Sequence, residues 1–336
     1  MQSSESLVRV MRGGIEESIH TGALALVENG ALTLSRGDPD RVVFYRSASK
    51  PLQALELVVS GAADAFGLTA AELAIAVGSH NGEPRHLAAV RSILAKAGVD
   101  ETSLRCGGHR SVNSDVAFAQ RRDNVPVTSI LSNCSGKHAG MLAAAKHRGE
   151  HRGLTLEGYL ELAHPVQQAI LDHVAAFAGI PRSQVFAGVD GCGAPALALP
   201  LVAMARSIAN LGAPAALPGP LIEAALRIGS AMRAHPEMVA GEERFDTDLM
   251  LASHGRVIAK AGAEGVHVTA IPDRRSALAI KVDDGSDRGY RAVVIEVLRR
   301  LSVLSDNDAD ELRARHATTV QKNLAGKPVG RLEPTF

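Results

Sequence analysis

The sequence contains no tryptophan, and only 3% of its 336 residues are aromatic. A sizeable core therefore has to be built from Ala, Val, Leu and Ile, a composition that favours closely packed helices. An excess of charge is also missing, because 36 Lys and Arg residues balance 36 Asp and Glu residues. The chain has no basic block interleaved with aromatic residues, so we expect no nucleic-acid partner.

Long apolar runs are absent as well. No stretch approaches the ~20 apolar residues that span a bilayer, and the polar residues 1–12 lack the apolar segment of a signal peptide. We therefore expect no membrane association and a cytoplasmic location. The three cysteines, Cys106, Cys134 and Cys192, are too few and too scattered for a disulfide framework, so we interpret them as free thiols or metal ligands.

Strand patterns occur near both ends of the chain. Residues 23–27 and 31–35 flank an Asn-Gly pair that favours a tight hairpin turn, and residues 42–45 predict a short strand that leads directly into Ser47. Alternating apolar residues predict three further strands in the C-terminal third, at 256–261, 266–271 and 276–283. We expect the Gly- and Pro-containing tail beyond residue 318 to be a loop.

The middle of the chain has a helical pattern. Thr69 and Glu72 predict a capping box, and Gly179 is placed to end a helix over 165–178. Further helices are expected at 84–97, 135–147, 197–210, 221–234 and 288–304. The sequence therefore predicts an α+β fold, with an antiparallel sheet built from both chain termini and a helical subdomain inserted between them. We expect one domain, 1–336, with a sheet subregion at 1–60 and 240–310 and a mainly helical subregion at 61–239.

Residues 46–51 (RSASKP) place a hydroxyl and an amine one helical turn apart. Because an α-helix repeats every ~3.6 residues, Ser47 and Lys50 project from the same face. A serine beside an unprotonated lysine is an activated nucleophile. In the alternative interpretation, Ser47 is only an N-cap and Lys50 is its solvated neighbour.

Two more signals follow in a fixed order. Ser79-His80-Asn81 lies in a predicted loop between helices, and Lys260-Ala261-Gly262 lies on a predicted strand. The serine β-lactamases and penicillin-binding proteins carry S-x-x-K, S-D-N and K-T-G in this order. Here His80 replaces the aspartate and Ala261 replaces the hydroxyl residue, so a β-lactam is not the first substrate that we expect.

Four other stretches decide between the possible families: 12–20 (RGGIEESIH), 79–84 (SHNGEP), 133–141 (NCSGKHAGM) and 190–193 (DGCG). With residues 46–51, they resemble the type III, rhizobial thermolabile class of L-asparaginases, from residue 12 to about residue 284. The resemblance implies a serine β-lactamase-like fold, hydrolysis of L-asparagine to aspartate and ammonia, and a homodimer. It also implies one Ser-Lys tandem from Ser47 and Lys50 and a second from Ser79 and Lys260.

The same resemblance implies a zinc ion held by Cys134, Lys137 and Cys192, with Asp190 close to the metal-bound water and the substrate. Cys-x-x-Lys is not an ordinary zinc spacing, and a lysine must lose its proton before it can bind a metal. The alternative is that both cysteines are small buried apolar residues. We expect zinc as the cofactor, held by this unusual set of ligands.

Amide hydrolysis needs a nucleophile, a base and donors for the oxyanion. Ser47 can attack if Lys50 is neutral, and two lysines in one pocket would lower each other's pKa. We expect Ser79 to relay a proton to the departing ammonia, and Arg46 or His80 to hold the substrate α-carboxylate. The competing hypotheses are a serine β-lactamase or peptidase-like hydrolase, and a non-catalytic amino-acid or metal sensor on the same fold.

Overall fold

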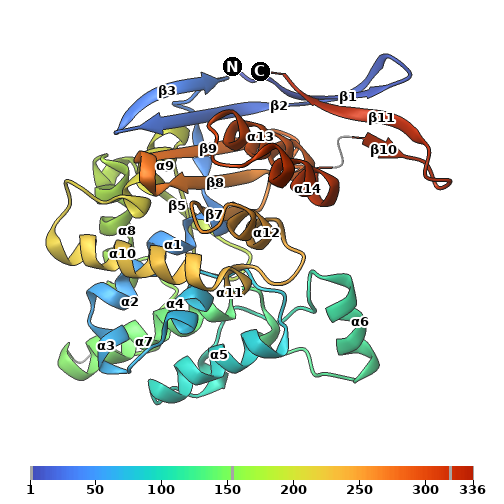
Figure 1. Ribbon diagram of the computed structural model, residues 1–336. Coiled ribbons are helices and arrows are strands. Elements are labelled where there is room, and N and C mark those ends of the chain that lie inside the picture. Colours follow the sequence, from blue (N-terminus) through green and yellow to red (C-terminus); the bar gives the residue numbers. More distant parts are fainter. Residues whose placement is uncertain (1–2, 153–154, 318–319, 336) are drawn as a thin grey trace.

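The main sheet joins the two ends of the chain. The computed structural model describes residues 3–152, 155–317 and 320–335. Eight antiparallel strands form this sheet in the order β10-β11-β1-β2-β9-β8-β7, with β3 paired to β2 (Figure 1). Their bounds are β1 (Glu5–Arg12), β2 (Ile15–Glu28), β3 (Ala31–Arg36), β7 (Ile258–Gly262), β8 (Val266–Ile271), β9 (Ser276–Val282), β10 (Val320–Lys322) and β11 (Pro328–Pro334). The predicted α+β class and the sheet built from both termini are confirmed.

The predicted hairpin turn is present. Asn29 and Gly30 have φ angles of 50° and 81° between β2 and β3, the positive values that a tight two-residue turn needs. Residues 23–27 of β2 are all buried. Because successive side chains of a strand point to opposite faces, both faces of the sheet are covered at this strand.

The loop prediction for the tail was wrong. β10 and β11 occupy it, and β11 pairs with β1 from Val8–Pro334 to Arg12–Gly330. Neither β1 nor β11 had been predicted. Each has one partner strand close in the sequence, β2 for β1 and β10 for β11, but their pairing with each other joins opposite ends of the chain and has no local signal. Leu332 is buried in this edge of the sheet and fixes which face of β11 points inward.

Most of the helices come from the middle of the chain and lie below the sheet in Figure 1. Helix α8 (Pro165–Ala178) ends at Gly179 with φ 65°, and α4 (Ala70–Ala76) begins with the Thr69–Glu72 capping box, as predicted. The others are α1 (Lys50–Gln53), α2 (Leu55–Val59), α3 (Ala62–Ala65), α5 (Pro84–Lys96), α6 (Ser114–Arg122), α7 (Ser135–Arg152), α9 (Leu201–Gly212), α10 (Gly219–Ala234), α11 (Pro236–Val239), α12 (Phe245–Ala252), α13 (Asp287–Arg300) and α14 (Asp306–His316). None of the helices in the described ranges is long and apolar enough to cross a bilayer.

A second, three-stranded sheet carries two of the predicted motifs. Its order is β4 (Val42–Phe44), β6 (Pro195–Pro200) and β5 (Phe186–Val189), all antiparallel. The helix predicted at 197–210 therefore begins only at Leu201, because residues 195–200 pair as a strand between β4 and β5. The end of β4 leads to Ser47, and the end of β5 leads to Asp190, so this small sheet places the two motifs next to each other.

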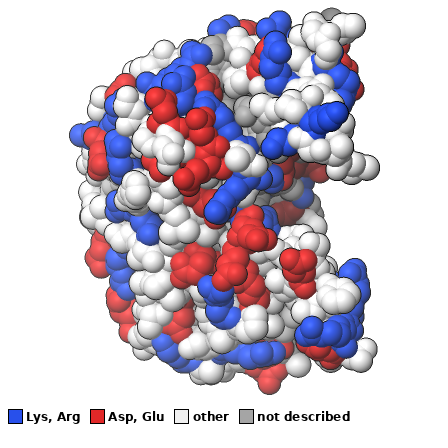
Figure 2. All heavy atoms as spheres, turned by 45° about the vertical axis from the view of Figure 1, so that its right-hand side comes forward, with Lys and Arg blue, Asp and Glu red and all other residues white. Residues whose placement is uncertain are grey.

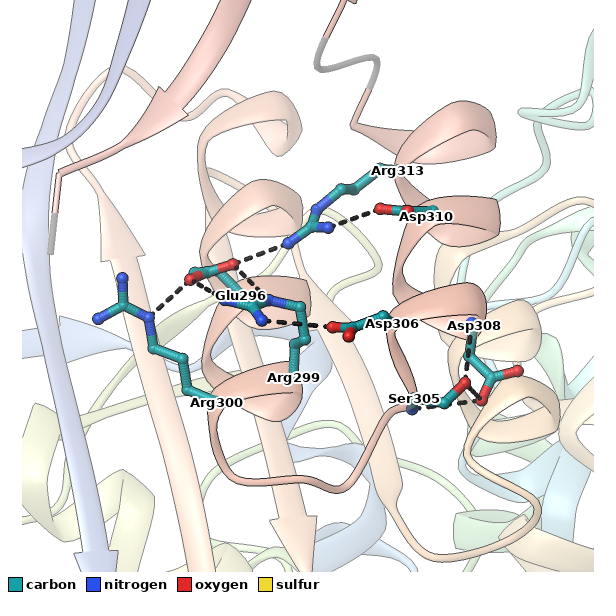
Figure 3. A network of polar contacts seen from close by, with 8 residues as sticks. All are labelled: Glu296, Arg299, Arg300, Ser305, Asp306, Asp308, Asp310 and Arg313. Atoms are coloured by element: carbon teal, nitrogen blue, oxygen red, sulfur yellow. Dashed lines mark hydrogen bonds and ion pairs between the residues drawn. The ribbon is translucent and has the colours of Figure 1, made fainter.

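Helices α13 and α14 are joined by a polar network. Figure 3 shows the carboxylate of Glu296 on α13 surrounded by the guanidinium groups of Arg299, Arg300 and Arg313. The Arg313 contact, 2.7 Å long, comes from α14 and crosses between the helices. Lys and Arg side chains are interspersed with Asp and Glu over the face drawn in Figure 2, in keeping with the balanced charge of the sequence.

Candidate active site

The segment around Ser47 is held rigidly by its neighbours. The buried Tyr45 hydroxyl donates to Met204 O over 3.1 Å and also lies 2.9 Å from Ser207 Oγ. Arg46 follows with a left-handed φ of 51°, an uncommon conformation for a residue with a side chain. Ser47 lies half-buried in a short 3-10 helix, Arg46–Ser49, that continues into α1. The predicted junction of strand, serine and helix is confirmed.

Ser79 lies at the centre of the polar cluster. It follows α4, and its backbone N–H donates to Val239 O over 2.7 Å. Lys50 Nζ is 2.9 Å and Lys260 Nζ 3.0 Å from Ser79 Oγ. The helix α1, the loop after α4 and the strand β7 therefore each bring one side chain to this point.

The lysines make contacts that differ from the predicted tandems. Lys50 Nζ also donates to Gly78 O over 2.6 Å and to Asn133 O over 3.3 Å, while Lys260 Nζ donates to Ala261 O over 2.9 Å. Ser79 and Lys260 are brought together as expected. Within the described part of the chain, however, neither lysine is hydrogen-bonded to Ser47, and Lys50 contacts Ser79 instead.

A glycine allows β7 to approach the Ser47 segment. A Cβ atom on Gly262 would lie 2.8 Å from Tyr45 O and 3.3 Å from Ala48 N. The first distance is shorter than real Cβ contacts show and the second is tighter than most of them, so this approach of the two backbones favours glycine. The glycine of Lys260-Ala261-Gly262 thus explains how a strand 210 or more residues further along the chain can place its lysine beside Ser79.

Burial controls the charge of both lysines. Their exposed fraction is 1% each, and burial lowers the pKa of Lys50. Burial also lowers the pKa of Lys260 to about 7, with the Asp246 carboxylate opposing the shift and the charge of Lys50 adding to it. A buried amine with a pKa near neutrality is equipped to act as a base.

The predicted metal ligands form a second cluster next to the first. Lys137 Nζ donates to Cys192 Sγ over 3.1 Å, and Cys134 Sγ lies 3.3 Å from Asn133 Oδ1. A hydrogen bond from Cys192 and the charges of Lys50 and Lys137 hold the pKa of the Cys134 thiol well below its usual value. The pKa of Cys192 is raised by the hydrogen bond with Cys134 and by burial. The negative charge therefore lies on the Cys134 sulfur, and the Cys192 thiol keeps its proton and donates a hydrogen bond to Cys134.

These donors can be compared with what zinc requires. Within the described ranges, no group of three or more His, Cys, Asp or Glu side chains is placed to hold a metal, so a zinc site here depends on the Lys137 amine. Two sulfurs and one nitrogen leave a fourth tetrahedral position for water. The donors fit such a site, provided that the cation displaces the proton of Lys137.

Comparison with known proteins gives the family. The sequence profile of L-asparaginase II matches residues 8–334. The chain belongs to the L-asparaginase II family. It is accordingly an amidohydrolase that acts as an L-asparaginase, and the predicted family is confirmed. A comparison with curated protein sequences found no match.

Solved structures also resemble this asparaginase. A β-lactamase/D-alanine carboxypeptidase from Pseudomonas syringae has a TM-score of 0.43 at 12% identity, with 84% of this chain and 93% of that chain covered. A β-lactamase from Mycobacterium bovis has a TM-score of 0.36 at 14% identity, covering 88% and 95%. A protein named Mglu has a TM-score of 0.36 at 16% identity, covering 89% and 70%. At these scores the likeness carries no inference about the site.

The residues expected to bind substrate are placed differently. The Arg46 guanidinium donates to Asp190 Oδ1 over 3.1 Å, so these two side chains pair with each other in the asparaginase. His80 is buried, and Gly82 N–H donates to its Nδ1 over 3.1 Å, while its Nε2 lies 3.0 Å from Ser135 Oγ. Burial holds the pKa of His80 well below its usual value. A neutral ring with both nitrogens occupied has no donor left for a carboxylate.

Two residues of the asparaginase site were missed. Asp246 Oδ2 is 3.8 Å from Lys260 Nζ, and Arg244 donates to Asn81 Oδ1 over 2.9 Å. The positive charge of Arg244 lowers the pKa of both His80 and Lys260, so this guanidinium faces the cluster. Both residues lie between the helix predicted at 221–234 and the strand predicted at 256–261, where no local pattern marked them.

Proposed function

We propose that this asparaginase hydrolyses the side-chain amide of L-asparagine at the cluster formed by Lys50, Ser79 and Lys260, with Ser47 as the nucleophile. The observation that supports this proposal is the convergence of two buried lysines on one hydroxyl. Two ammonium groups in such a site would repel each other strongly, so one amine is neutral near pH 7 and can accept a proton.

The hydrogen bonds of Lys50 suggest how the proton moves. A neutral lysine keeps two N–H donors and one lone pair. Gly78 O and Asn133 O take the two donors, which leaves the lone pair directed at the Ser79 hydroxyl. Ser79 can then pass a proton between the two amines while its oxygen stays in place, so the three groups act as one base and later as one acid.

Ser47 is the hydroxyl better placed for attack. It is half-buried, whereas Ser79 is buried with 7% exposed. The Ser47 oxygen attacks the amide carbon, and its proton passes to the lysine-serine unit. That unit returns the proton to the leaving nitrogen, and ammonia departs as the ester forms. A water molecule then attacks the ester, releases aspartate and restores the Ser47 hydroxyl.

We further propose that Cys134, Lys137 and Cys192 hold zinc. When bound, the zinc ion would supply a positive charge close to the site where the substrate binds. Its ligands are Cys134 directly before α7, Lys137 in the first turn of α7, and Cys192 in the loop after β5, and none of them belongs to the lysine-serine unit. Zinc is therefore a tuning or structural cofactor in this proposal, and the nucleophile does not depend on it.

An ammonia-release assay tests the function directly. Purified protein is incubated with L-asparagine, L-glutamine or a penicillin, and we expect ammonia from asparagine. The Ser47→Ala variant should lose this activity, and no acyl-enzyme should be detected by mass spectrometry. Covalent labelling by penicillin without asparagine turnover would favour the β-lactamase or peptidase hypothesis, and stabilisation by asparagine without turnover would favour the sensor hypothesis.

The homodimer and the cytoplasmic location also remain proposals, and the family resemblance is their support. Light scattering coupled to size-exclusion chromatography should give a mass of about twice the 35.1 kDa of one chain. A mass of one chain at micromolar concentration would contradict the dimer. Fractionation of cells that produce the untagged chain should place it with the cytoplasmic proteins.

A further inference from the structure

A buried carboxylate lies directly behind the amine of Lys260. Asp246, on α12, is 3% exposed. Its Oδ2 accepts a hydrogen bond from Ala261 N–H over 2.8 Å, and its Oδ1 lies 3.1 Å from His267 Nε2. The carboxylate is thus hydrogen-bonded to strand β7 at Ala261, the residue that follows Lys260.

His267 is fixed in turn by its own partners. The Thr269 hydroxyl lies 3.2 Å from His267 Nδ1, and both side chains are fully buried. If Thr269 donates to Nδ1, the ring hydrogen is on Nε2 and points at Asp246. The ring stacks on Tyr290 with centroids 4.9 Å apart and meets the edge of Phe245 at 5.4 Å. Thr269, His267 and Asp246 therefore form one chain that ends behind Lys260.

We propose that Asp246 is a positioning residue for Lys260, oriented by His267 and Thr269. The inference rests on the proposed role of Lys260 in proton transfer. The distance of 3.8 Å between Asp246 Oδ2 and Lys260 Nζ is too long for a good hydrogen bond. The amine is consequently left free to reach Ser79 Oγ and Ala261 O, while the carboxylate charge still acts on it.

The charges that face Lys260 explain why such a carboxylate is needed. Burial and the cations of Lys50, on α1, and Arg244, before α12, all lower the pKa of Lys260, whereas Asp246 and the more distant Cys134 thiolate raise it. Asp246 itself stays ionised, because His267 and Lys260 hold its pKa below the usual range in spite of burial. Without Asp246, the amine would be a weaker base with no partner to fix its direction.

The test compares two aspartates on the same helix. Asp246→Asn keeps the shape and removes the charge, and Asp248→Asn is the control, because Asp248 pairs with His316 over 2.7 Å and not with a lysine of the site. For the wild type we expect kcat to rise through pH 7 and then level off. In Asp246→Asn this rising limb of the pH profile should move to lower pH by about one to three units. At its plateau, kcat should fall at least tenfold, with KM little changed.

Three further results decide the matter. Asp246→Glu should restore part of kcat. If Asp246→Asn fails to fold, Thr269→Val takes its place: this variant keeps the carboxylate, so its kcat should fall by less than we expect for Asp246→Asn. A limb that stays near pH 7 in folded Asp246→Asn, or an equal shift in Asp248→Asn, would overturn the inference. If Lys260→Met keeps full activity, the proposed function fails instead; if it is inactive while the limb of Asp246→Asn is unmoved, only the present inference fails.

Discussion

Lys50 Nζ and Lys260 Nζ lie 2.9 and 3.0 Å from the same atom, Ser79 Oγ. The two lysines are separated by 210 positions in the sequence and come from a helix and a strand. Because both are buried, each lowers the cost of leaving the other unprotonated. Burial lowers the pKa of both amines, and the shared hydroxyl connects them through one atom, which is the arrangement that our proposed proton transfer requires.

The first prediction concerns this hydroxyl. We expect Ser79→Ala to lower kcat for L-asparagine by about 10²- to 10⁴-fold, the usual range for a lost acid-base group, because the two amines lose the atom that joins them. Steady-state ammonia release measures the effect. Ser253→Ala is the matched control: Ser253 is fully buried and donates to Met250 O over 2.9 Å, away from the lysines. Equal activity of Ser79→Ala and wild type would contradict the proton relay.

The sequence predicted the members of this site better than their partners. Ser47, Lys50, Ser79 and Lys260 could be found because each belongs to a short motif whose order is characteristic. Helical spacing, however, paired Lys50 with Ser47, whereas the fold turns Lys50 towards Ser79, the Gly78 carbonyl and the Asn133 carbonyl. Those acceptors come from distant segments, and no local periodicity can indicate them.

The same distinction holds for the fold. The β2–β3 hairpin and helix α8 were predicted because Asn29-Gly30 and Gly179 have local signals for a turn and a helix end. The strands β1 and β11 were missed: each has one partner strand close in the sequence, but the pairing of β1 with β11 spans the whole chain and has no local signal. Asp246 was missed for a similar reason, since its importance depends on the backbone of Ala261 and the ring of His267.

The second prediction concerns zinc. We expect Cys134→Ser to bind much less zinc than wild type and to retain part of its activity, because the nucleophile lies outside the metal cluster. Elemental analysis after purification in reducing buffer without chelator measures the metal content. Cys106→Ser is the control, since the Cys106 thiol donates to Ser129 O over 3.3 Å and is not one of the predicted ligands. Wild type without zinc, or equal zinc in both variants, would contradict the site.

The third prediction concerns the approach of β7 to the Ser47 segment. In Gly262→Ala the added methyl group would lie 2.8 Å from Tyr45 O, so the strand must move away and carry Lys260 with it. We expect kcat/KM to fall about 10- to 100-fold and the free energy of unfolding to fall by about 1–3 kcal/mol. Kinetics and urea unfolding measure the two effects.

A second glycine provides the control for this change. Gly219 begins α10 and has no atom within 4 Å of its added Cβ, so Gly219→Ala should leave both activity and stability nearly unchanged. If Gly262→Ala behaves like Gly219→Ala, the close approach of β7 does not position Lys260.

The last prediction uses the network of Figure 3 to separate stability from catalysis. Hydrogen bonds from Arg299 and Arg300 outweigh the effect of burial and lower the pKa of Glu296 to about 2. Because this value lies below that of the unfolded chain, the stabilisation is complete above about pH 4.5 and is lost as the pH falls towards 2. We expect Glu296→Gln to reduce the free energy of unfolding by about 1–3 kcal/mol at pH 7, without a change in KM.

Urea unfolding at pH 7, 4 and 3 tests the sign of this dependence. The difference between wild type and Glu296→Gln should shrink at each step, because protonation makes the wild-type side chain neutral like the amide. Glu311→Gln, at an exposed position of α14, should show no such trend. A difference that stays constant from pH 7 to pH 3 would mean that packing, and not the charge of Glu296, joins α13 to α14.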